Sequence, residues 1–137
     1  TMSLNGILAG LVGITANCDC VTNGESLIIG AVAGVIVMIA ITVLDKLKID
    51  DPVGAFPVHG CCGLWACLAT GIFGEGKDLT VQAIGSFSIA GFSLVVMLIV
   101  FGILKAVNLL RVSRQEEIEG LDIHEHGMPC YATDSAY

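Results

Sequence analysis

Four long runs without Asp, Glu, Lys or Arg constrain the fold of this chain more than any other feature. They cover residues 2–17, 26–44, 52–74 and 79–104. Every run except the first comfortably reaches the ~20 residues that an α-helix needs to cross ~30 Å of hydrocarbon. Only 14% of the residues are charged, whereas a soluble domain has about 25%. We therefore predict an all-α membrane protein.

The predicted architecture is four transmembrane helices within residues 1–110, followed by a polar tail. The helices are expected at about 2–17, 26–46, 52–73 and 79–110, and the tail at 111–137. The first run starts almost at residue 1, as if its helix had been cut. It also lacks the basic start and the cleavage site of a signal peptide.

The basic residues predict the orientation of the chain. Five of the six lie in loop 45–51 or after the fourth run, and only Lys77 lies in loop 74–79. Cytoplasmic segments near membrane helices are rich in Lys and Arg. We therefore expect a multi-pass protein of the cell membrane, with loop 45–51 and the C-terminus in the cytoplasm.

His59 is the candidate functional residue of the third run. Between Asp51 and Glu75 it is the only ionisable residue apart from cysteines. An ionisable group within a membrane helix usually marks a functional site. A buried neutral imidazole offers one hydrogen-bond donor and one acceptor to a small polar solute. The alternative is a histidine that bonds a neighbouring helix; Gly60, Gly63 and a nearby proline favour a pore lining.

The start of the third run resembles a capped helix. Asp51 can cap through its side-chain oxygen, and Pro52 suits the first helical position. Pro57, a turn or more further on, is then expected to kink the helix or to free a backbone carbonyl just before His59. Eight residues separate Asp51 from His59, a rise of about 12 Å. This count places the imidazole near the middle of the membrane.

The remaining polar and small residues have less specific interpretations. Glycines spaced three or four apart predict close helix packing; they are Gly6, Gly10, Gly13, Gly30 and Gly34. The tail has too few apolar residues for its own core, so it is expected to be disordered unless it docks on the loops.

The chain offers only weak signals for metal binding and none for catalysis. Cys18–Cys20 and His124–His126 each lack further ligands for a metal. A phosphate loop, a catalytic triad and paired carboxylates within a span are all missing. We expect no enzymatic activity, metal, cofactor or nucleic-acid partner.

Several segments together resemble the ammonium transporters of the Amt/Mep family. DDPVGAFPVHG at 50–60, continuing as GCCGLWACLATGIF, is similar to the family's penultimate membrane helix. LNGILAGLVGIT at 4–15 and SLIIG at 26–30 resemble the two helices before it. EGLDIHEHGMPCY at 119–131 resembles the family's cytoplasmic tail signature, which includes a nearby tyrosine, here Tyr131. The resemblance covers nearly the whole chain.

The resemblance implies the last four helices of an eleven-helix subunit that forms homotrimers. It implies that His59 is the second of two histidines lining a hydrophobic pore for ammonium or ammonia. The first histidine, the phenylalanine gate and the outer recruitment site belong to helices outside this chain. In the family mechanism ammonium is deprotonated, ammonia crosses the pore along the imidazoles, and the proton moves separately or is returned.

The resemblance also implies a coupling role for residues on the cytoplasmic side. These are Asp51 at the end of the pore helix and Gly120, Asp122 and Gly127 in the tail. A PII-type signal protein is a possible partner there. His124 replaces the regulatory threonine of plant members, which puts a phosphorylation switch in doubt, and Cys20 differs from many members. The alternative function is an ammonium sensor, in which a transport-like core is coupled to signalling.

Overall fold

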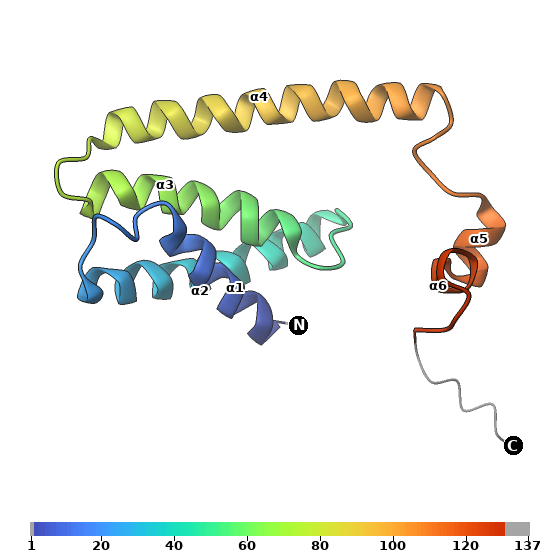
Figure 1. Ribbon diagram of the computed structural model, residues 1–137, viewed down its shortest axis with the longest axis horizontal. Coiled ribbons are helices and arrows are strands. Elements are labelled where there is room, and N and C mark those ends of the chain that lie inside the picture. Colours follow the sequence, from blue (N-terminus) through green and yellow to red (C-terminus); the bar gives the residue numbers. More distant parts are fainter. Residues whose placement is uncertain (1, 131–137) are drawn as a thin grey trace, which may run out of the picture. The chain divides into compact units, whose positions relative to one another are not determined.

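The computed structural model describes residues 2–130, which form helices joined by turns and loops (Figure 1). Contacts divide the chain between Phe92 and Ser93 into an N-terminal unit, called the bundle below, and a C-terminal unit. The helical segments are α1 Met2–Thr15, α2 Asn23–Leu47, η1 Phe56–Cys61, α3 Cys62–Phe73, α4 Leu79–Ala106, α5 Arg114–Glu119 and α6 Leu121–His126.

The core of the bundle lies where α1, α2 and the continuous η1–α3 helix meet. In Figure 1, α1 crosses α2 and α3 obliquely. Small residues dominate the contact, because the buried cluster consists of Ala9, Ala33, Val37, Val58 and Cys62. Small side chains let helix backbones approach closely, and dispersion contacts then stabilise the packing in lipid.

Only one of the five glycines expected at helix contacts packs closely within the bundle. A Cβ atom added to Gly13 would lie 2.9 Å from the Cβ of Ala33, so α1 and α2 need a glycine there. An added Cβ at Gly6, Gly10, Gly30 or Gly34 would meet nothing within 4 Å in the described structure. Close packing at these four positions, which are half-buried, therefore stays a prediction.

Local hydrogen bonds set both ends of α2. Thr22 and Glu25 form a capping box at its start, which pairs two otherwise free N–H groups. At its end Lys48 adopts a left-handed conformation with φ 56°. The N–H of Lys48 then bonds the carbonyl of Asp45, and the N–H of Ile49 bonds that of Leu44. This Schellman arrangement satisfies carbonyls that the helix leaves unpaired.

The third helix begins at Phe56. The sequence had predicted a start at residue 52. Pro52 lies in a turn, and Gly54 follows with φ +76°. That left-handed conformation interrupts any helix that would start at Pro52. Pro57 therefore lies in the first turn of η1, where a missing N–H costs little. It does not kink an established helix.

Helix α4 has 28 residues and ends earlier than predicted. It ends at Ala106, before the expected residue 110, because Asn108 takes a left-handed conformation with φ 57°. The N–H groups of Asn108 and Leu109 bond the carbonyls of Lys105 and Leu104. This second Schellman arrangement closes the helix as at the end of α2.

Three helical segments are long and apolar enough to cross a membrane, namely 23–47, 56–73 and 79–106. The remaining predicted span, the first in the chain, corresponds to α1, an apolar helix of only 14 residues. The described residues contain no strand. The predicted class, an all-α membrane protein, is thus confirmed.

The polar tail contains two short helices, which corrects the expectation of disorder for residues 114–126. Ser113 and Glu116 form a capping box at the start of α5. Gly120, with φ +100°, joins α5 to α6, and Gly127, with φ +68°, ends α6. An exposed polar pair supports the turn between α5 and α6: Glu119 Oε2 and His124 Nε2 form a hydrogen bond of 2.6 Å. Hydrogen bonds and caps replace the apolar core that this segment lacks.

Candidate functional site

His59 lies on the single π-helical turn of the chain's described part, at the start of the third membrane helix. Its neighbours Pro57 and Val58 are buried, and Val58 belongs to the bundle core. His59 itself is exposed. Single π-helical turns occur often at functional sites, because they redirect side chains within a helix. The core thus holds one side of this turn and presents the imidazole on the other.

The helix start at Phe56 changes the depth expected for His59. The rise from Phe56 to His59 is only about 4.5 Å at the α-helical 1.5 Å per residue, whereas the sequence suggested about 12 Å from Asp51. The count from Asp51 fails because residues 52–54 are not helical. Residue counting therefore does not place this imidazole at mid-membrane.

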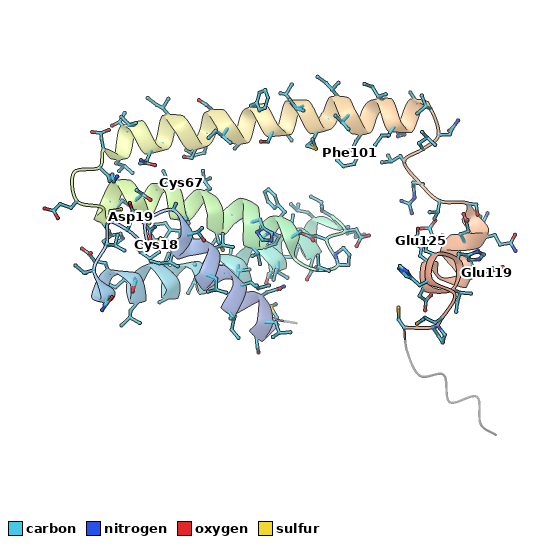
Figure 2. The ribbon with its side chains drawn as sticks, viewed as in Figure 1. Cys18, Asp19, Cys67, Phe101, Glu119 and Glu125 are labelled. Carbon is cyan, nitrogen blue, oxygen red and sulfur yellow. The ribbon has the colours of Figure 1, made fainter. Side chains whose placement is uncertain are left out.

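Within the bundle, His59 borders an apolar groove of about 350 Å³. Gly60, Gly63, Leu64 and Cys67 line it from the same helix; Figure 2 labels Cys67 on α3. Ser86, Ile89 and Ala90 complete the lining. The two glycines leave the backbone open on this side. A small solute there would find few polar groups besides the imidazole and the Ser86 hydroxyl.

The imidazole is free within the described structure. Among residues 2–130, no side chain or carbonyl forms a hydrogen bond with His59. Other polar side chains do bond neighbouring helices: the Trp65 indole N–H donates to the carbonyl of Ile29 at 3.1 Å. Within residues 2–130, hydrogen bonds between the helices thus come from residues other than His59.

Asp51 holds the start of the His59 turn. Its Oδ1 accepts the N–H of Ala55 and its Oδ2 accepts the N–H of Phe56, both at 2.8 Å. The two N–H groups lower the pKa of the Asp51 carboxyl from its ordinary value, since they favour the charged form. Asp51 thus pairs N–H groups at the helix start through its side chain, but not from the position directly before the helix that the sequence predicted, because residues 52–54 intervene and Ala55 is the N-cap residue.

The predicted tail residues lie together in the C-terminal unit. Gly120 and Gly127 bound α6, and the Asp122 carboxylate accepts the N–H of Cys130 at 2.8 Å. That hydrogen bond lowers the pKa of Asp122 and folds segment 127–130 back onto α6. Figure 2 labels Glu119, the partner of His124, in the same unit. Tyr131 of the tail signature lies outside the described residues.

The sequence analysis did not identify a role for the two buried asparagines of the first run, Asn5 and Asn17. The Asn5 Nδ2 donates to the carbonyl of Val53 at 3.2 Å. The Asn17 Nδ2 donates to the carbonyls of Gly13 and Ala66, at 3.2 and 3.1 Å. Amides in an otherwise apolar run are a signal that could have found them, because such groups need partners in lipid.

Comparison with known proteins gives a consistent result along the whole chain. The sequence model of the Ammonium Transporter Family matches residues 1–131. The chain is 46% identical over 128 residues to a relative from Synechocystis sp., covering 92% of this chain and 29% of the relative.

Two archaeal relatives are similarly close. Ammonium transporter Amt2 of Archaeoglobus fulgidus is 38% identical over 156 residues, covering 95% of this chain and 32% of that protein. Ammonium transporter Amt1 of Haloferax mediterranei is 42% identical over 132 residues, covering 93% and 26%. The chain thus spans about a third or less of the length of these relatives.

Proposed function

This chain belongs to the ammonium transporter family, and we propose that it forms part of a transmembrane passage for ammonia or ammonium, with His59 on its lining. The observation that carries the proposal is the state of His59. It is the only histidine in a membrane-length helix, it is exposed on an anchored π turn, and it has no hydrogen-bond partner among residues 2–130.

The proposed passage suits a neutral solute better than a bare ion. A charged group that crosses the hydrocarbon pays at least about 2.5–3.5 kcal/mol at the membrane centre, and the groove at His59 offers little polarity along the way. Ammonia is neutral, and it can accept or donate a hydrogen bond to an imidazole. The two ring nitrogens can also pass a proton on. His59 would act as a hydrogen-bonding and relay group together with a second histidine from the rest of the protein.

The cytoplasmic face is proposed to couple this passage to the tail. Asp51 fixes the loop before the His59 turn. Gly120, Asp122 and Gly127 give the tail a defined fold that could dock on such loops. We place the C-terminus in the cytoplasm from the distribution of Lys and Arg. Assembly as a homotrimer and contact with a PII-type signal protein belong to the same proposal.

Uptake of methylammonium tests the proposed role of His59. The full-length protein and its His59→Ala variant would be reconstituted in liposomes at equal density. We expect the variant to lose uptake by roughly tenfold, because the solute loses a hydrogen-bond partner in an apolar environment, worth about 1–3 kcal/mol.

The matched control is Cys61→Ala, a small change on the same π turn. Cys61 borders a different apolar groove, together with Phe56. Its uptake should stay within about twofold of the parent, since surface changes away from a site usually alter free energies by less than 0.5 kcal/mol. Unchanged uptake and unchanged proton coupling in His59→Ala would contradict the proposal.

A further inference from the structure

We propose that Asn5 is a positioning residue for His59: the α1 amide fixes the loop that sets the direction of the imidazole. This inference rests on the proposed function of His59. The two residues lie on different helical segments, 54 positions apart in sequence, and are linked through loop 51–55.

The first link joins Asn5 to the loop. Asn5 is 9% exposed, and its Nδ2 donates to the carbonyl of Val53 at 3.2 Å. The amide also sits directly beside Gly54, where an added Cβ would lie 2.6 Å from Nδ2. Gly54 is buried and has φ +76°. Glycine is therefore needed both for the backbone conformation and for the approach of the amide.

The second link joins the loop to the π turn. The carbonyl of Gly54 accepts the N–H of Val58 at 3.1 Å. Val58 immediately precedes His59, and its side chain is buried in the core. The Asp51 carboxylate accepts the N–H of Ala55 at the end of the loop and that of Phe56 at the start of η1. A shift of Gly54 would therefore move the backbone that carries the imidazole, while the core side of the turn stays fixed.

The bundle itself offers a matched control for this inference. Asn17, which lies in the turn just after α1, is also a buried amide, and it bonds the third helix through the carbonyl of Ala66 at 3.1 Å. Ala66 lies seven residues beyond His59, about 10 Å along the helix. Asn17→Leu should therefore weaken the same pair of helices without moving the π turn.

The experiment compares Asn5→Leu and Asn17→Leu in the full-length protein, in liposomes, with His59→Ala in parallel. The readouts are the thermal midpoint and the pH profile of methylammonium uptake. Both Asn variants should lower the midpoint, since each loses a buried hydrogen bond. Asn5→Leu alone should also shift the pH profile in the direction of His59→Ala and lower uptake about fivefold, the effect expected for about 1 kcal/mol.

Asn5→Ala is a second variant in case leucine at this position prevents folding. The inference is overturned if the pH profile of the Asn5 variants stays that of the parent, or shifts equally in Asn17→Leu. The proposed function fails separately, and first, if His59→Ala itself keeps the parent's uptake and pH profile.

Discussion

A single carboxylate, that of Asp51, caps the start of the third membrane helix. It accepts two N–H groups that follow a turn, those of Ala55 and Phe56. Without it, both N–H groups would lose their protein partner at the start of the helix. The two N–H groups stabilise the charged form of the Asp51 carboxylate, and the carboxylate in turn holds the loop in place.

Replacing Asp51 by alanine should lower the free energy of unfolding, as the loss of other helix caps does. The parent should lose the stabilisation by the Asp51 carboxylate in acid, because the carboxylate is then protonated. The folded-state pKa of Asp51 lies below its unfolded value, so the stabilisation is complete above about pH 4 and decreases as the pH falls through the folded-state pKa.

Thermal unfolding of the parent and of Asp51→Ala in detergent, between pH 3 and pH 7, measures this effect. The difference between the two proteins should be greatest at neutral pH and should shrink toward pH 3. A constant difference across that range would show that the carboxylate charge has no role in the cap.

Among the elements, α1 and α2 depend on one glycine contact. A Cβ atom added to Gly13 would lie 2.9 Å from the Cβ of Ala33. A Cβ atom added to Gly10, on the same helix, would meet nothing within 4 Å in the described structure. Alanine favours a helix over glycine by about 1 kcal/mol. Gly10→Ala should therefore be neutral or stabilising in the chain of residues 1–137.

Gly13→Ala should instead destabilise that chain by about 1–3 kcal/mol, the usual cost of overpacking. Thermal midpoints in detergent compare the two variants directly. Equal midpoints would contradict the close contact between α1 and α2 at this position.

Helix boundaries show how far local sequence patterns reach. The apolar runs located the three membrane-length helices, but the sequence suggested a start at residue 52 and an end at 110. The Asp51-Pro52 pair fits a helix start and a turn equally well. The Gly54 turn is packed against Asn5, 49 residues away, and such a contact cannot be read from the local pattern. The end at Ala106 follows from a left-handed Asn108, a signal that sequence reasoning could have used.

In the whole molecule, the apolar surface is much larger than the core. Many large apolar side chains are exposed, and α4 has no buried residue. This surface suits lipid and further helices, as expected of a chain that spans about a third or less of its relatives. The sequence identified the family through the motifs around His59 and in the tail. It could not show that Asn5, Asn17 and Trp65 bond the helices, because each pairs with a backbone carbonyl distant in sequence.

The most direct test of the central claim is an experimental structure of the full-length protein in a lipid environment. We predict that the His59 imidazole faces an apolar passage inside its own subunit, with a second imidazole within hydrogen-bonding distance, about 3 Å. An imidazole that faces the lipid, or that bonds only a structural side chain or carbonyl of a neighbouring helix, would contradict it.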